Sequence, residues 1–229
     1  MNVPFITELH EHIRKIRSAR DVLFVPGKQY PRFEQIVLLK PAPILSPLSE
    51  LLKKRRSADA MSGAPLPLEK VSTILHESLA IREDNHRPHP SGGARFPIEV
   101  YVIPFNVSGL PRFTYHYRPD THALEILWPM PETAQFSTYC HDTGTCTHAS
   151  ALVLLSAFWE RSAMRYSSFA FELALIEAGH IGQNIVLTSG ALGIASRPLS
   201  SYREDVITKE LDLDPTREQP IYAVALGES

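Results

Sequence analysis

One stretch of the chain, residues 169–192, constrains the fold more than any other. Apolar residues recur in it at three- and four-residue steps, on nearly all sides of a helix, and it contains no proline. A helix that is apolar on nearly all sides is expected to be buried, so we predict a long core helix about which the chain folds. At about 1.5 Å per residue it would extend roughly 35 Å. Glu172, Glu177 and His180 argue against a membrane span, and we expect His180 to be a core residue.

The composition is that of an ordinary globular protein. The 229 residues are 44% hydrophobic and 21% charged, enough for one sizeable core. A formal net charge of -2 gives no electrostatic reason to expect nucleic acid or an anionic membrane as a partner. Two cysteines make no disulfide framework, and no signal-peptide pattern opens the chain, so we expect a cytoplasmic location.

The remaining pattern predicts an α+β fold with a mixed sheet around the long helix. Helices are expected at residues 5–17, 47–57, 67–79, 147–166 and 201–211. Strands are expected at residues 98–105, 113–117, 123–127 and 220–227, with a short strand after Gly193. The proline-broken residues 21–47 are expected to be extended. We therefore divide the chain into an N-terminal helix and arm (residues 1–47) and one domain (residues 48–229).

A basic cluster forms the end of the short helix predicted to begin at Pro47. Arg55 and Arg56 are followed by Ser57, and two guanidinium forks with a hydroxyl are groups that hold a phosphate. A basic helix end is also favoured by the helix dipole alone, which leaves a solvated surface as the alternative.

Two further stretches offer backbone groups to a ligand. Ser91, Gly92 and Gly93 lie between prolines, where paired glycines permit close backbone approach, although a plain turn is the alternative. The second stretch is Pro198-Leu199-Ser200-Ser201. Ser201 with Glu204 matches a capping box, which predicts a helix N-terminus there.

A long irregular segment contains two cysteines and two histidines, Cys140, His141, Cys146 and His148. Their spacing is unlike that of common zinc sites. We therefore expect an incidental loop and no metal.

These stretches, in order along the chain, resemble the flavin-dependent nitroreductase superfamily. The resemblance is strongest to its SagB-type branch, the azoline dehydrogenases of thiazole- and oxazole-forming peptide pathways, and it runs from about Leu48 onward. It rests on an ordered set of short motifs: Arg55-Arg56-Ser57, Pro90-Ser91-Gly92-Gly93-Ala94, Pro97-Ile98-Glu99-Val100-Tyr101, Gly109-Leu110, Tyr115-His116-Tyr117, His122-Ala123-Leu124-Glu125, Glu177-Ala178-Gly179-His180, Gln183-Asn184 and Ala191-Leu192-Gly193.

The resemblance implies a nitroreductase-like fold, a homodimer and FMN at the dimer interface. Arg55, Arg56 and Ser57 would hold the phosphate or ribityl chain. The backbone of Ser91, Gly92 and Gly93 would line the flavin, and Pro198-Leu199-Ser200-Ser201 would face the reactive edge of the ring. The implied reaction oxidises a peptide thiazoline or oxazoline to the azole, with hydride passing to FMN. A cyclase is an implied partner.

The chain departs from the family at several positions. The catalytic Lys-Tyr pair of SagB-type enzymes reads Arg165-Tyr166 here. An arginine stays protonated and cannot be a general base, which leaves Tyr166 as the candidate. Basic residues of the family are replaced by Asp59, Phe169 and Glu172.

Two other functions stay open. The lost basic residues favour a non-catalytic member that dimerises and scaffolds a biosynthetic complex. A flavin reaction of another kind, nitro or quinone reduction with NAD(P)H, is the third hypothesis.

Overall fold

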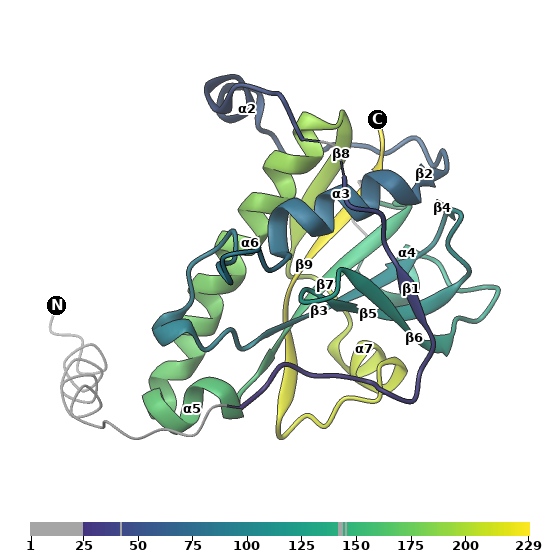
Figure 1. Cartoon of the computed structure of the whole chain (residues 1–229). Helices are drawn as coiled ribbons and strands as arrows, with labels where there is room; N and C mark the ends of the chain where they lie inside the picture. The colour runs from purple at the N-terminus through teal and green to yellow at the C-terminus, as the bar shows by residue number, and fades with distance from the viewer. Residues whose placement is uncertain (1–24, 42, 142–143, 145) are drawn as a thin grey trace, which may run out of the picture.

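The computed structural model of the protein describes residues 25–41, 43–141, 144 and 146–229. Its largest feature is a seven-stranded sheet in the order β1-β6-β5-β3-β7-β9-β8 (Figure 1), in which every neighbouring pair is antiparallel. The predicted mixed sheet would contain parallel as well as antiparallel pairs. Among the described residues, parallel pairing joins only β2 (Leu66–Pro67) and β4 (Val107–Ser108), in a small second sheet. The strands of the large sheet are β1 (Gln35–Val37), β3 (Ile98–Pro104), β5 (Phe113–Arg118), β6 (Ala123–Pro129), β7 (Ala151–Phe158), β8 (Ile194–Leu199) and β9 (Glu218–Glu228).

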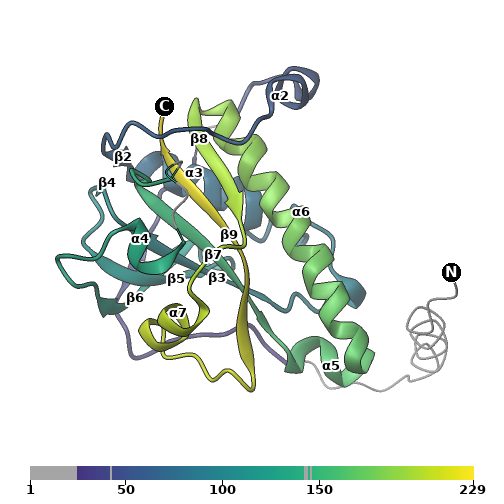
Figure 2. The same ribbon diagram turned by 180° about the vertical axis from the view of Figure 1, so that it is seen from behind.

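Helices cover both faces of the large sheet. On one face α3 (Leu68–Leu79) packs against the long α6 (Ala170–Ala191), and α4 (Phe136–Tyr139) and α7 (Glu204–Glu210) lie on the other (Figures 1 and 2). The remaining helices are short: α2 (Leu48–Lys54), the 3-10 turn η1 (Gly92–Ala94), α5 (Glu160–Tyr166) and the 3-10 turn η2 (Ser167–Phe169). The α+β class predicted from the sequence is confirmed.

The two-residue period of the strands produces these layers. In β7, Val153 and Leu155 join the core under α3 and α6, whereas Leu152 and Leu154 join the core under α4 and α7. All four are fully buried, and burying a side chain of this size stabilises the fold by roughly 1.5–3 kcal/mol. A strand that is apolar on both faces therefore lies inside the sheet, here between β3 and β9.

The predicted helix over residues 147–166 is wrong for most of its length. The segment forms β7, a turn and then α5. Its apolar residues also fit a helical spacing, and a short run that is apolar throughout does not distinguish a strand from a helix by periodicity. Pairing with β3 and β9 decides the outcome, and that pairing joins residues far apart in the sequence.

The long helix α6 lies where the sequence predicted it, but only one of its sides is buried. Phe171, Leu175 and Ile176 expose 50%, 41% and 54% of their surface, and His180 is exposed rather than in the core. The prediction of a helix buried on all sides is therefore wrong, because in this chain the sheet and α3 cover one face only. The buried positions recur at helical spacing: Ala170, Ala174, Glu177, Ala178, Ile181, Gly182, Ile185, Val186 and Ser189.

Most other predicted elements are confirmed to within a few residues, including α3, β3, the β5–β6 hairpin and β9. The predicted helix over residues 5–17 lies outside the described residues. The predicted capping box is wrong: α7 begins at Glu204 with Arg203 as its N-cap and no side-chain cap bond. The Ser201 hydroxyl instead donates to the His141 carbonyl (3.4 Å).

The described part of the predicted extended segment, residues 25–41 and 43–47, is largely extended and adds an edge strand to the sheet. Its residues 35–37 form β1, which pairs with β6. After the arm, α2 stands away from the body in Figures 1 and 2, and none of its residues is buried. The division into an arm (residues 1–47) and a domain (residues 48–229) stays a prediction.

A glycine on α6 sets how closely this helix approaches the sheet. A methyl group at Gly182 would lie 2.5 Å from Cε1 of Tyr222 on β9. A methyl group at Gly190, on the same helix, would meet no atom within 4 Å. Packing therefore requires a glycine at position 182 and leaves room for a side chain at position 190.

We expect Gly182→Ala to destabilise the protein by about 1–3 kcal/mol, because Tyr222 or the helix must shift. Gly190→Ala is the matched control and should be neutral or stabilising by up to about 1 kcal/mol, since alanine loses less backbone entropy in a helix. Urea unfolding followed by circular dichroism measures both effects. Equal free-energy changes would contradict the contact with Tyr222 as the reason for the glycine.

Candidate functional site

The predicted basic cluster lies at a groove near the C-terminal end of α6. The segment after α2 runs beside β8, where the Ala58 amide donates to the Ser196 carbonyl (2.9 Å) and Arg197 Nη1 donates to the Ala58 carbonyl (2.7 Å). Between this segment, α6 and β8 is a groove of about 560 Å³, lined by Arg55 and Arg56.

The groove carries positive charge that is not used inside the chain. Arg55 and Arg56 are exposed, and neither forms a hydrogen bond or ion pair within the part of the chain that the structure describes. Asp59 also lines the groove, but its side chain is 98% exposed and lies 3.9 Å from Arg197. Two free guanidinium groups at an open groove are suited to a phosphate.

The turn Pro198 to Ser201, which was predicted to contact the flavin ring, lies at the end of β8. Pro198 and Leu199 are the last residues of β8, and Ser200 and Ser201 follow as exposed residues. The structure therefore brings this turn and the basic cluster to one edge of the sheet. Ser57 is half-buried and is not among the residues that line the groove.

The predicted glycine loop lies at the other end of α6, against the predicted catalytic pair. Gly93 has a φ of +62°, and a methyl group there would collide with the Tyr166 hydroxyl and lie 3.6 Å from Cζ of Arg165. A methyl group at Gly92 would lie 3.0 Å from Cδ1 of Leu173 on α6. Within one chain, the space that the glycines leave is filled by these side chains.

A hydrogen bond fixes the conformation of the glycine loop, and the Tyr166 hydroxyl beside it has no hydrogen-bond partner among the described residues. The Phe96 amide donates to the Ser91 hydroxyl (2.8 Å) and closes the loop. The Arg165 guanidinium lies 5.5 Å from the centroid of the Tyr166 ring. The Tyr166 hydroxyl has no hydrogen-bond partner among the described residues, so it is free to meet a ligand.

The length of α6 separates the two groups of predicted residues. The groove includes Leu187 and Gly190, whereas the glycine loop contacts Leu173. The 14 residue steps from Leu173 to Leu187 correspond to about 21 Å along the helix. One chain therefore does not surround a single reactive centre with both groups.

In the described part of the segment with two cysteines and two histidines, these four side chains do not gather into one site. Cys140 and Cys146 are buried, whereas His141 and His148 are exposed. Among the described residues, no group of three or more His, Cys, Asp or Glu side chains is placed to hold a metal ion. No helix in the described ranges combines the length and the apolar composition that crossing a bilayer needs.

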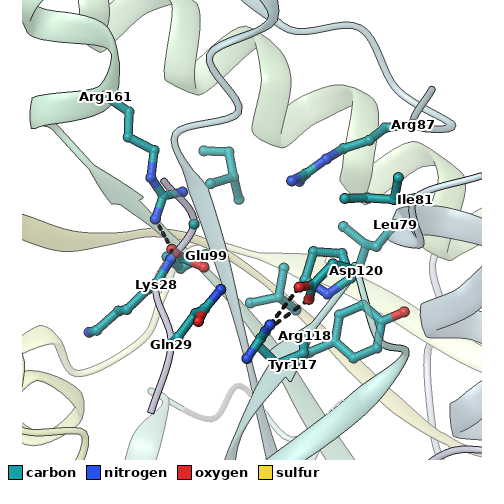
Figure 3. A pocket seen from close by; sticks show the side chains of 14 residues that line it. Lys28, Gln29, Leu79, Ile81, Arg87, Glu99, Tyr117, Arg118, Asp120 and Arg161 are labelled. Carbon is teal, nitrogen blue, oxygen red and sulfur yellow. Dashed lines mark hydrogen bonds and ion pairs between the residues drawn. The ribbon is translucent and has the colours of Figure 1, made fainter. Parts of the chain in front are cut away.

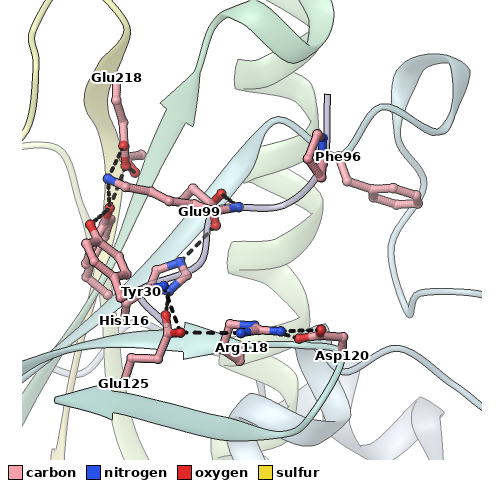
Figure 4. A network of polar contacts seen from close by, with 12 residues as sticks. Tyr30, Phe96, Glu99, His116, Arg118, Asp120, Glu125 and Glu218 are labelled. Atoms are coloured by element: carbon pink, nitrogen blue, oxygen red, sulfur yellow. Dashed lines mark hydrogen bonds and ion pairs between the residues drawn. The ribbon is translucent and has the colours of Figure 1, made fainter. Parts of the chain in front are cut away.

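A buried network of charged side chains lies beneath the N-terminal arm and beside a small cavity (Figures 3 and 4). At its centre is His116 on β5, which is fully buried. Its Nδ1 lies 2.7 Å from Glu125 and its Nε2 lies 2.9 Å from Glu99. Because both ring nitrogens face carboxylates, the imidazole is held in its protonated form. Arg161 of α5 pairs with Glu99, and Arg118 donates to Glu125 (3.3 Å).

The network also fastens the arm to the sheet. The Lys28 amide donates to Glu99 (2.8 Å), and the Tyr30 amide donates to Glu125 (2.9 Å). Lys28 Nζ donates to Glu218 on β9 (2.6 Å). The arm therefore closes over the charged side chains and shields them from water.

The sequence prediction assigned no role to this network, although its members stand out in the sequence as charged residues within apolar strands. Glu99, His116 and Glu125 are each surrounded by apolar residues in their strands. A charged side chain in a buried strand needs a partner. Only the register, which places His116 opposite Glu125, shows which partner it has.

Comparison with known proteins gives a family match over most of the chain. A family model described as "Nitroreductase family" matches residues 52–228. A protein of Methanocaldococcus jannaschii named as a nitroreductase is 25% identical over 181 residues, covering 79% of this chain and 90% of its own length.

Two curated relatives take part in peptide processing. The microcin B17-processing protein McbC of Escherichia coli is 30% identical over 151 residues, which cover 62% of this chain and 54% of McbC. The trifolitoxin-processing protein TfxB of Rhizobium leguminosarum bv. trifolii is 28% identical over 178 residues, covering 70% of this chain and 48% of TfxB. This chain thus spans about half the length of either relative.

Solved structures confirm the fold. A nitroreductase-like protein of Ralstonia eutropha has a TM-score of 0.74 at 22% identity, with 92% of this chain and 96% of that chain covered. The E. coli microcin synthetase McbBCD complex with truncated pro-MccB17 bound gives a TM-score of 0.71 at 21% identity, covering 96% and 81%. A protein of Desulfovibrio desulfuricans in complex with FMN gives 0.53 at 18% identity, covering 80% and 86%.

The charged network predicts how stability depends on pH. Burial opposes a charge on His116, but the hydrogen bonds to Glu125 and Glu99 outweigh it and raise the pKa of His116 above its ordinary value of 6.5. Burial favours neutral Glu99, but His116 and Arg161 outweigh it and lower the pKa of Glu99. The stabilisation that the charged form of His116 contributes is complete below pH 6.5 and is lost as the pH rises through its raised pKa. The stabilisation that ionised Glu99 contributes is lost at acid pH, as this carboxylate becomes protonated.

We therefore expect the free energy of unfolding, measured in urea, to fall as the pH rises above about 6.5 and through the raised pKa of His116. His116→Gln should remove this alkaline fall and cost about 3–5 kcal/mol at pH 6, because it leaves buried carboxylates without their partner. His141→Gln, at an exposed site, is the control and should keep the wild-type profile. An alkaline fall that persists in His116→Gln would show that another group causes it.

Proposed function

Because the chain belongs to the nitroreductase family, we propose that it is an FMN-dependent dehydrogenase that oxidises a peptide azoline, or a similar peptide-derived substrate, to the aromatic azole. The observation that supports this most is the open groove at which Arg55 and Arg56 have no partner among the described residues. The names of McbC and TfxB favour a peptide substrate, and the complex of a similar structure with FMN favours this cofactor.

The residues at the groove fit FMN. Its volume of about 560 Å³ lies within the range of about 300–1,000 Å³ that is usual for sites of drug-sized ligands. Arg55 and Arg56 would hold the phosphate, and Pro198 to Ser201 would offer backbone groups to the ring. Asp59 does not block the groove, because its carboxylate is almost fully exposed.

We propose that a second copy of the chain completes the site. Two surfaces lack a partner in one chain: α2, with Leu48 and Leu52 exposed by 61% and 53%, and the outer face of α6 around Ile176. An isolated helix as short as α2 is not stable in water without packing. A homodimer across α6 would cover both surfaces and bring the partner's glycine loop and the partner's Tyr166 to the groove of this chain.

In this arrangement the chain supplies position and a proton acceptor. Bound FMN would supply the hydride acceptor. Tyr166 would take the proton from Cα of the azoline, and Arg165 beside it would hold positive charge near the phenol oxygen. Gly93 keeps the backbone out of the space that the Tyr166 hydroxyl needs. A cyclase partner and a cytoplasmic location belong to the same proposal, the former by analogy with the McbBCD complex.

One observation favours a non-catalytic scaffold as the second candidate function. The position of the family's lysine is Arg165, which cannot accept a proton. Purified protein that holds no FMN and takes up none when it is added would support the scaffold. Rapid NAD(P)H oxidation with a nitroaromatic acceptor would instead support a nitro- or quinone reductase.

We expect Arg55→Gln combined with Arg56→Gln to weaken FMN binding by about tenfold or more, because each charge-assisted hydrogen bond contributes about 1.5–3 kcal/mol. Arg203→Gln, at an exposed arginine beside α7, is the matched control and should bind FMN as the wild type does. Fluorescence of free flavin after equilibrium dialysis measures the affinity. Unchanged affinity in the double variant would place the phosphate elsewhere.

We expect Tyr166→Phe to retain FMN but slow its reduction by substrate by ~10²–10⁴-fold, as losing an acid-base group does. Bleaching of the flavin after anaerobic mixing with a synthetic thiazoline-containing peptide measures this step. Tyr139→Phe is the control, because the Tyr139 hydroxyl is buried and has no hydrogen-bond partner among the described residues. A wild-type rate in Tyr166→Phe would remove Tyr166 from the mechanism.

A further inference from the structure

A cavity beneath the N-terminal arm is lined by a half-buried cation, Arg87, that makes no direct ion pair with any described residue. The cavity has a volume of about 210 Å³ and lies between the arm, β3, the end of β5 and the loop after α3. Figure 3 shows the Arg87 side chain extending from this loop toward the cavity. The glycine loop of the proposed flavin site follows Arg87 in the sequence. The cavity and the groove at Arg55 and Arg56 share no lining residue.

The other charges at the cavity are already paired. Glu99 accepts hydrogen bonds from the Lys28 amide and His116 and pairs with Arg161. Asp120 accepts from Arg118 Nε (2.8 Å). With Glu125 and Glu218 included, four carboxylates face four cations in this network: Glu99, Asp120, Glu125 and Glu218 against Lys28, His116, Arg118 and Arg161.

Arg87 is the additional cation. Its guanidinium stacks on the Phe96 ring (4.2 Å to the centroid) and makes no hydrogen bond or ion pair within the described ranges. The carboxylates of Glu177, Glu99 and Asp120 act on it only through their more distant fields. Burial accordingly lowers the pKa of Arg87 below its ordinary value. A guanidinium has five N–H donors, and burying them without acceptors is costly.

The opposite wall of the cavity is apolar. Leu79, Ile98 and Val100 line it and are buried. An inorganic anion would gain nothing from this wall, whereas an organic anion would bury its carbon atoms there. The volume is below the usual range for drug-sized ligands, which limits the occupant to a small molecule.

We propose that this cavity binds a small organic monocarboxylate, with Arg87 pairing with the carboxylate and the apolar wall holding the hydrocarbon part. Arg87 would donate two parallel hydrogen bonds to the carboxylate, the geometry that suits a guanidinium fork. The arm residues Gly27 to Gln29 close the cavity on one side. This site does not depend on the proposed flavin chemistry.

Titration calorimetry with benzoate as the probe tests the proposal on the purified 229-residue chain. We expect wild type to bind benzoate with a dissociation constant on the order of 1 mM or tighter. Benzamide, the neutral analogue, should bind at least about tenfold more weakly, because its head group carries no charge for the guanidinium. Phosphate should not compete, since it makes no use of the apolar wall.

Arg87→Gln should weaken benzoate binding about tenfold or more, and Arg203→Gln should leave it unchanged. Arg87→Gln loses the stacking on Phe96 but no hydrogen bond or ion pair, so without benzoate it should unfold close to the wild-type temperature, which keeps the test independent of folding. Equal benzoate affinity in Arg87→Gln, or no binding to wild type, would overturn the proposal. Phosphate that competes with benzoate in wild type, but not in Arg87→Gln, would overturn the organic class of ligand.

Discussion

The contact between α6 and the sheet is the constraint on which the rest of the structure depends. Gly182 lets the helix lie directly on Tyr222, and small or branched residues at helical spacing continue the contact along its length. This packing uses one face of the helix. The opposite face, with Phe171 and Ile176, stays exposed in a single chain.

The same helix determines where the candidate site can form. It separates the free arginines of the groove from the glycine loop and Tyr166. Exposed apolar side chains lie on the N-terminal part of its outer face, at Phe171, Leu175 and Ile176. Exposed apolar surface of this kind marks an interaction site in soluble proteins. A dimer across α6 is therefore the simplest arrangement that covers this face and joins both parts of the site.

Local patterns in the sequence predicted most of the elements correctly. The position of α6, the start of α3 after Pro67 and the β5–β6 hairpin follow from apolar spacing, proline and turn residues, which act over a few neighbours. Pairing partners are not encoded locally. That is why β7 was predicted as a helix and why the exposed side of α6 was predicted to be buried.

The candidate site was predictable only in part, for the same reason. Arg55 and Arg56 were identified from residue type and from the family resemblance, and the structure places them at an open groove. The network around His116 depends on strand register, so its contacts could not be predicted from local sequence patterns. Arg87 lies in a loop rich in proline, and its lack of a direct ion pair with any described residue is a property of the folded chain alone.

The central claim is that two copies of the chain form one flavin site. A crystal structure of the protein with FMN tests it most directly. The account predicts a dimer across α6, with the phosphate on Arg55 and Arg56 of one chain and the ring beside the partner's Tyr166. A monomer that holds FMN entirely with residues of one chain would contradict it, as would phosphate density away from these arginines.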